Sequence, residues 1–130
     1  MKLSPDKSDA QTIRGYGPGW IAINNDKLQT SLLVGSAGLR LDWGCRSFAA
    51  LNADHFAVLA QQATAMQAEV VLFGSGERLR FVPPAWHLAL IQQRIGMETM
   101  DTAAACRTFN ILAGEGRRVL AALLLEQSET

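Results

Sequence analysis

Residues 96–125 read GMETMDTAAACRTFNILAGEGRRVLAALLL, and this stretch decides the fold. Residues 97–100 are predicted as a short strand, and 102–112 as a helix with Asp101 as its N-cap. The run over 117–125 has good helix propensity, but it is short and has no polar face, which favours a buried strand. The stretch is therefore a predicted β-α-β unit that closes a sheet.

Before this unit, the spacing of apolar residues along the chain is first helical, then typical of strands, and then helical again. Proline at the first position predicts a helix over 84–94, and Gly96 is expected to end it in the left-handed conformation. A buried strand is predicted over 69–73, and a short extended segment over 78–82. A capped helix is indicated further upstream by apolar residues at helical spacing, namely Phe56, Leu59, Ala60, Ala63 and Met66.

The first third of the chain is predicted to be a layer of short strands. Glycine-rich and Asn-Asn-Asp turns separate the candidate strands at 13–16, 20–23, 30–34 and 39–43. Strands that alternate with helices further along imply right-handed crossovers and a central mixed, largely parallel sheet. The predicted fold class is α/β, with the N-terminal β-rich layer against or beside that sheet.

Length and composition predict one packed domain over 12–126, between a flexible arm, 1–11, and a tail, 127–130. Hydrophobic residues make up 48% of the chain and charged residues 18%, which is typical of a globule. Basic and acidic residues number 12 each, and this balance disfavours nucleic acid as a partner. No run approaches the ~18 apolar residues that insertion into a membrane requires. A soluble, cytoplasmic protein is expected.

The cysteines and histidines do not predict a metal or nucleophile site. Cys45 and Cys106 stand 61 positions apart, which is neither a metal-binding pair nor a disulfide framework. His55 and His87 lie on separate predicted helices without an acidic residue at ligand spacing. We therefore predict no metal, no cofactor and no catalytic residues.

The turn Gly74-Ser75-Gly76 is a first candidate for binding. It follows a buried strand, where open α/β sheets often bind ligands, and Arg78 and Arg80 could attract an anion. The motif matches no known phosphate-binding loop, and no helix starts immediately after it. An ordinary tight turn is the favoured interpretation.

A second candidate lies on and after the helix over 102–112. Arg107 and Asn110 are three residues apart and share a face that could hold a carboxylate or a carbonyl group. A structural role is favoured, in which Arg107 ties the helix to nearby carboxylates and Asn110 holds the glycine turn. The full set of candidate binding residues is Gly74, Ser75, Gly76, Arg107, Asn110, Glu115 and Arg117.

Several stretches together resemble a family found in bacteria, archaea and mitochondria that includes the mitochondrial respiratory complex I assembly factor 3. They are IRGYGPGWIAIN, SLLVGS, EVVLFGSG, the helix that begins with two prolines, GMETMDTAAACRTFN and EGRRVLAALLL. The resemblance implies a three-layer α/β fold with a central mixed sheet. It also implies assembly helpers that bind other proteins, including a membrane-associated complex, and it carries over no catalytic residues.

Two hypotheses about function follow from these observations. The favoured one is a non-catalytic protein-binding or assembly-helper module. The alternative is a small-molecule or anion-binding protein, or an unrecognised enzyme, with a pocket near Gly74-Ser75-Gly76 and Arg107. A flat apolar patch with an exposed tryptophan would favour the first hypothesis, and a concave cleft lined by these residues would favour the second.

Overall fold

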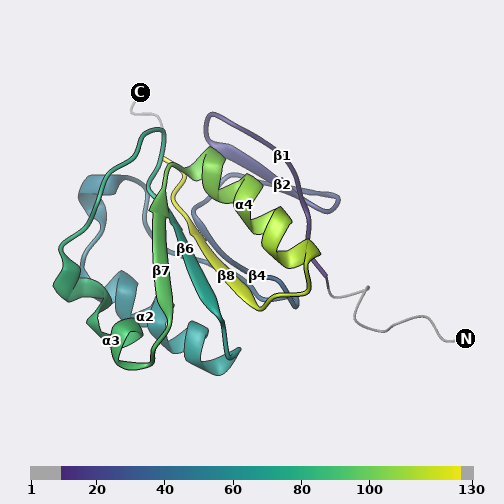
Figure 1. Ribbon diagram of the computed structural model, residues 1–130. Helices are drawn as coiled ribbons and strands as arrows, with labels where there is room; N and C mark the ends of the chain where they lie inside the picture. The colour runs from purple at the N-terminus through teal and green to yellow at the C-terminus, as the bar shows by residue number, and fades with distance from the viewer. Residues whose placement is uncertain (1–9, 127–130) are drawn as a thin grey trace, which may run out of the picture.

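The computed structural model describes residues 10–126, which form two sheets and their covering helices in three layers (Figure 1). The predicted arm and tail fall largely on 1–9 and 127–130, which lie outside the described residues. The strands are β1 (Ile13–Gly17), β2 (Trp20–Ile23), β3 (Asp26–Leu28), β4 (Leu32–Gly35), β5 (Arg40–Asp42), β6 (Val70–Gly74), β7 (Gly96–Met100) and β8 (Val119–Leu123). The helical elements are η1 (Phe48–Ala50), α2 (Ala53–Ala65), η2 (Pro84–His87), α3 (Leu88–Gln92) and α4 (Thr102–Gly114).

The strand β8 lies at the centre of the five-stranded sheet, whose order is β5-β4-β8-β6-β7. It pairs antiparallel with β4 and parallel with β6, and all five of its residues are buried. A strand covered on both faces needs apolar side chains on both, so its sequence does not alternate. The predicted strand over 117–125 is confirmed.

The connections around β6, β7 and β8 pass over opposite faces of the sheet. The chain runs from β6 through η2 and α3 to the parallel strand β7, then through α4 to β8 on the other side of β6. Two of the four neighbouring pairs are parallel, and the pairs β5-β4 and β4-β8 are antiparallel. The prediction of an α/β fold with a central mixed sheet and crossover helices is confirmed.

One face of the central sheet packs against α2 and α3 around an aromatic cluster. The Phe56 and Phe73 rings meet edge to face with centroids 5.2 Å apart, and Trp43 lies 5.5 Å from Phe56 in a similar arrangement. The Trp43 indole N–H donates to the carbonyl oxygen of His55 at 3.0 Å, so the buried polar atom has a partner.

At the start of α2, Asn52 caps the helix in a capping box with His55.

The opposite face packs against α4 and the three-stranded sheet β1-β2-β3 (Figure 1). From α4, Ala105, Cys106 and Phe109 are fully buried in this layer. From the small sheet, Ile21 and Ile23 are also fully buried. Helix α4 therefore shares one face of the central sheet with the N-terminal strands.

The N-terminal β-rich layer is divided between the two sheets, which the sequence analysis did not foresee. Alternate residues of β4 point to opposite cores: Leu33 lies in the α2–α3 core, and Leu32 and Val34 lie in the α4 core. A strand with two buried faces has to lie inside the central sheet. Strand β2 buries alternate positions and β1 buries only Ile13, so both can stand outside it. The predicted turn at Asp26 is instead the start of β3.

Three local predictions were wrong in detail. The predicted helix over 84–94 is the short η2 followed by α3, which ends at Gln92. Arg94, with φ of 61°, takes the left-handed conformation, and Gly96 instead begins β7. Residues 78–82 form no strand, because the Ser75 hydroxyl holds this backbone in a loop, accepting from the amide of Arg80 at 2.9 Å.

Ordered structure begins before Thr12. Gln11, assigned to the arm by the sequence analysis, is buried, and its amide group donates to the carbonyl oxygens of Gly35 and Leu39 at 2.7 Å each. Its side-chain oxygen accepts from Arg40 Nε at 3.0 Å. These bonds connect the entry to β1 with the turn between β4 and β5.

Candidate functional site

The turn after β6 uses its polar atoms within the protein. Ser75 is fully buried, and its hydroxyl donates to the carbonyl oxygen of Arg78 at 2.7 Å. Gly76 has a φ of 103°, which a residue with a side chain rarely adopts, so glycine is required here. Gly74, Ser75 and Gly76 therefore form a tight turn whose inner polar groups are satisfied.

Thr102, the first residue of α4, joins three chain segments beneath this turn. Its Oγ1 atom accepts from the amide of Gly76 at 2.9 Å and its hydroxyl donates to the carbonyl oxygen of Leu124 at 2.8 Å. Its own amide donates to the carbonyl oxygen of Gly76 at 2.9 Å. Thr102 stands within the polar set at the start of this helix but was not among the candidate binding residues, because a threonine directly after an N-cap gives no signal of such a role.

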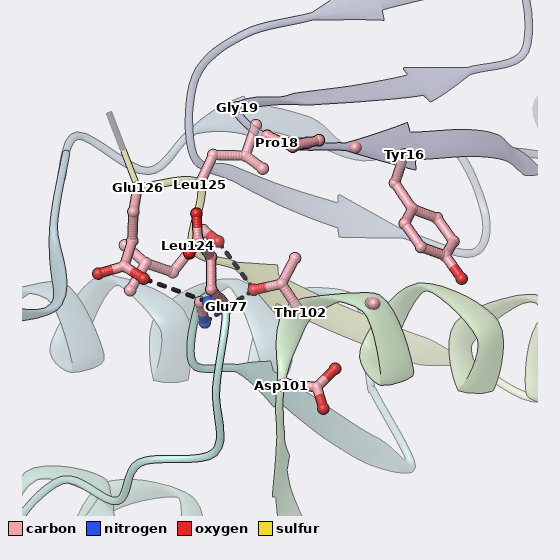
Figure 2. A pocket seen from close by; sticks show the side chains of 12 residues that line it. Tyr16, Pro18, Gly19, Glu77, Asp101, Thr102, Leu124, Leu125 and Glu126 are labelled. Carbon is pink, nitrogen blue, oxygen red and sulfur yellow. Dashed lines mark hydrogen bonds between the residues drawn. The ribbon is translucent and has the colours of Figure 1, made fainter. Parts of the chain in front are cut away.

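A cleft of about 300 Å³ lies above Thr102, outside the carboxyl ends of the parallel strands (Figure 2). One wall comes from the turn between β1 and β2, and the others come from the loop after β6, the start of α4 and the end of β8. The lining residues are Tyr16, Gly17, Pro18, Gly19, Gly76, Glu77, Asp101, Thr102, Ala103, Leu124, Leu125 and Glu126.

A half-buried ion pair joins the loop after β6 to the end of β8. Arg80 Nη2 lies 2.7 Å from Glu126 Oε1 and also donates to the carbonyl oxygen of Ser75 at 2.8 Å. Burial raises the pKa of Glu126, but the hydrogen bonds from Arg80 and the Glu77 amide, with the Arg80 charge, outweigh burial and hold this pKa below its usual value. Arg80 is thus engaged by an internal carboxylate.

Arg107 and Asn110 both contact β1. Arg107 is exposed, and its Nη1 atom donates to the hydroxyl of Tyr16 at 2.9 Å. Asn110 accepts from the amide of Ile13 at 2.9 Å and donates to the carbonyl oxygen of the same residue at 2.8 Å. Asn110 thus imitates a neighbouring strand and docks the small sheet on α4.

The remaining two candidates lie at the far end of α4. Glu115 is the exposed residue that follows the helix, and Arg117 Nε lies 3.6 Å from Glu69 Oε1. A helix of 13 residues is roughly 20 Å long, so these residues are distant from the turn after β6. Of the predicted set, only Gly76 lines the cleft, while Arg107 bonds to one of its lining residues.

Both thiols are buried and free. Burial raises the pKa of Cys106 to about 12 and that of Cys45 to about 11, which suppresses the reactive thiolate of each. Within residues 10–126, no three acidic, histidine or cysteine side chains gather in a way that could hold a metal ion. In the same part of the chain, no helix is long and apolar enough to cross a membrane.

The outer surface of α2 and α3 is a second notable feature, and sequence reasoning missed it. The segments 55–68 and 81–93 contain no Asp, Glu, Lys or Arg, although basic and acidic residues number 12 each in the chain. Counting charges along the sequence would have found them. We define the α2–α3 surface by Ala57, Val58, Gln61, Thr64, Ala65, Leu88, Ala89, Ile91, Gln92 and Gln93.

This surface contains both a groove and exposed apolar side chains. The groove has a volume of about 530 Å³ and runs between α2 and α3, with Ala57, Ala60 and Ala89 among its lining residues. Beside it, Leu88 is 50% exposed and Ile91 is 55% exposed. Phe81, in the preceding loop, is 69% exposed.

Comparison with known proteins identifies relatives of this chain. An uncharacterized protein of Rhodobacter capsulatus is 35% identical over 92% of this chain and 89% of its own length. NADH dehydrogenase (ubiquinone) 1 alpha subcomplex assembly factor 3 of Xenopus tropicalis is 28% identical over 97% of this chain and 67% of its own length.

Among solved structures, the solution NMR structure of a Mth938-like domain from Bordetella pertussis is similar, with a TM-score of 0.82 and 30% identity. The match covers 99% of this chain and 95% of that one. Residues 13–124 also match the model of a family described as proteins of unknown function, DUF498/DUF598. The chain therefore belongs to the DUF498/DUF598 family.

Proposed function

We propose that this protein is a non-catalytic assembly helper that binds another protein through the α2–α3 surface. The observation that carries the proposal is the lack of charge in the two segments that build this surface. Helices that face water normally carry charged side chains on their outer side. The cores of protein interfaces are instead depleted of charge and rich in apolar side chains.

The side chains on this surface suit a protein partner. Val58, Leu88 and Ile91 are each exposed by 42% or more, so their burial by a partner would be favourable. Gln61, Gln92 and Gln93 line the groove and can donate and accept hydrogen bonds without a charge to desolvate. The groove between the helices can receive side chains from an apolar helix face.

The relatives suggest which partner this could be. Because several are named assembly factors of NADH dehydrogenase (ubiquinone), we propose that the partner is a subunit of such a membrane-associated respiratory complex. The helper is proposed to act in the cytoplasm and to cover an uncharged subunit surface before that surface is buried in the complex. The balance of charges in the chain gives no support to nucleic acid as a partner.

A photo-crosslinking pair tests the proposal. Ile91 and Ile111 are exposed isoleucines, 55% and 61%, on helices that cover opposite faces of the central sheet. Replacing Ile91 with p-benzoylphenylalanine in the native cell should yield a crosslink to a subunit of the NADH dehydrogenase complex. The same replacement at Ile111 should yield little or none.

A functional pair complements the crosslinks. The substitution Ile91→Lys should lower the amount of assembled complex, and Ile111→Lys should not, provided that both variants accumulate normally. Equal crosslinking from the two positions would contradict a specific α2–α3 contact. Crosslinks from Ile91 only to proteins outside the complex would contradict the proposed partner.

A further inference from the structure

We propose that the cleft above Thr102 binds a small organic cation, a protonated amine attached to an apolar body. The cleft is separate from the α2–α3 surface, because it is formed by the β1–β2 turn, the start of α4 and the strand ends. This inference is therefore independent of the proposed assembly role. It rests on the topology of the sheet, the preformed walls of the cleft and the groups left free within it.

The topology produces the cleft. The connection that leaves β6 passes to the α3 face of the sheet, whereas the connection that leaves β7 passes to the α4 face. Where neighbouring parallel strands send their connections to opposite faces, a crevice opens outside their carboxyl ends. The cleft lies at this point, between the loop after β6 and the start of α4, and the β1–β2 turn adds a further wall.

Internal hydrogen bonds hold the walls of the cleft together. The hydrogen bonds of Thr102 to Gly76 and Leu124 hold the loop, the helix start and the strand end together. The amide of Leu124 also donates to the carbonyl oxygen of Gly74 at 3.0 Å. A ligand entering here would pay little conformational entropy to order the floor of its site.

Most of the lining is apolar, and the charged side chains on the walls that form no ion pair within the described residues are negative. Pro18, Ala103 and Leu125 contribute hydrocarbon surface. Asp101 uses Oδ1 to cap α4, accepting from the amide of Ala104 at 2.8 Å, and its Oδ2 atom has no hydrogen bond within the described residues. In the same part of the chain, the amide of Glu77 donates to Glu126, and its carboxylate forms no ion pair.

Two positive charges lie near the cleft, on Arg80 and on Arg107. Arg80 is paired with Glu126, which neutralises that carboxylate. Arg107 donates to the neutral hydroxyl of Tyr16 and does not line the cleft; it attracts Asp101 but forms no ion pair with it within the described residues. Of the charged side chains on the walls, only those of Asp101 and Glu77 form no ion pair within the described residues, so an ammonium group would find its partners there.

The volume sets the size of the ligand. At about 300 Å³, the cleft stands at the lower limit of sites for small molecules, which are mainly apolar with a few placed polar groups. A short alkyl or small ring body can lie against Pro18 and Leu125 while its ammonium group points to Asp101. Asp101 and Glu77 are the groups expected to select for charge.

The test uses three probes of matched size and different charge on the ¹⁵N-labelled full chain. Butylammonium should shift the amide resonances of Gly19, Gly76 and Ala103 in a saturable manner. Butanol and butyrate at the same concentration should shift them little. Equal shifts with butanol would overturn the selection for a cation, and the absence of saturable shifts with butylammonium would overturn the site.

A pair of variants tests whether the Asp101 carboxylate binds the ammonium group. Asp101→Asn keeps a residue that caps a helix as well as aspartate does, so the fold should be retained. It should weaken butylammonium binding roughly five-fold through the loss of one partly exposed charge. Asp54→Asn, in the first turn of α2, removes the same charge at a remote exposed site and should change nothing. Equal weakening by both variants would mean unspecific attraction to a negative surface and would contradict the proposal.

Discussion

Thr102 and Gly76 exchange two hydrogen bonds, because the amide of each residue donates to an oxygen of the other at 2.9 Å. The pairing joins the turn after β6 to the first turn of α4, across 26 positions of sequence. Since the Thr102 hydroxyl also donates to Leu124, one side chain holds three strand ends in place. The geometry of the cleft depends on this residue.

Removing the Thr102 hydroxyl should destabilise the protein strongly. Thr102→Val keeps the shape but leaves the amide of Gly76 and the carbonyl group of Leu124 without a partner in a buried place. We expect the free energy of unfolding to fall by about 2–3 kcal/mol, measured by urea denaturation. Thr102→Ser retains the hydroxyl and should lose less than about 1 kcal/mol. Equal losses from both variants would assign the effect to packing alone.

Gly74 is required by close packing and Gly114 is not. A Cβ atom at Gly74 would lie 2.9 Å from Thr102 Cα and 3.1 Å from Ala105 Cβ, whereas one at Gly114 would meet nothing within 4 Å. Gly74→Ala should therefore cost about 1–3 kcal/mol of stability by forcing β6 and α4 apart. Gly114→Ala should be neutral or slightly stabilising, because alanine favours a helix. Thermal unfolding of the two variants checks the contrast.

Asn110 should control the attachment of the small sheet. Without the two hydrogen bonds between Asn110 and Ile13, the start of β1 is no longer bonded to α4, and Asn110→Ala should speed hydrogen exchange at Ile13 roughly ten-fold. The exchange rates of the β8 amides should change much less in this variant, since the central sheet is retained. Ile111→Ala, a change at the exposed neighbouring position, serves as the control and should leave exchange in β1 unaltered.

The Arg80–Glu126 pair should make stability depend on acid pH. The folded pKa of Glu126 lies below the unfolded value, so the ionised carboxylate stabilises the fold above the unfolded pKa. This contribution is lost as the pH falls from about 4.5 through the lower, folded pKa. Glu126→Gln should cost about 1–2 kcal/mol at pH 7 and progressively less as the pH falls below 4.

Unfolding curves of both proteins between pH 2.5 and 7 measure this difference. If the difference in the free energy of unfolding between the two proteins stayed constant over the whole range, the charge of Glu126 would contribute nothing to stability. Glu98→Gln alters an exposed carboxylate on β7 and should leave stability at pH 7 unchanged.

Local elements were predictable where their pattern depends on nearby residues. The period of Phe56 and Leu59 indicates α2, and Asp101 acts as the cap of α4 through a contact only three residues away. The continuous apolar run of β8 could be identified as a strand because both of its faces are covered. In each case the element is determined by contacts between residues close in sequence, or by burial alone.

The candidate site was predictable only in part, since its contacts join distant segments. Asn110 was expected to hold the nearby glycine turn, but it holds Ile13, 97 positions away. Arg107 was considered for contacts with carboxylates, whereas its partner is the hydroxyl of Tyr16. The helical period places Arg107 and Asn110 on one face, and only the packing of the small sheet decides what meets that face.

The central place of β8 has a consequence for the order in which the protein can fold during synthesis. Until the ribosome has produced Leu123, β4 and β6 each present an open edge where β8 will later lie, and the two halves of the sheet remain unjoined. Such edges attract other chains. The nascent protein is therefore most exposed to aggregation just before its last strand arrives, when a chaperone that shields open strands would help it most.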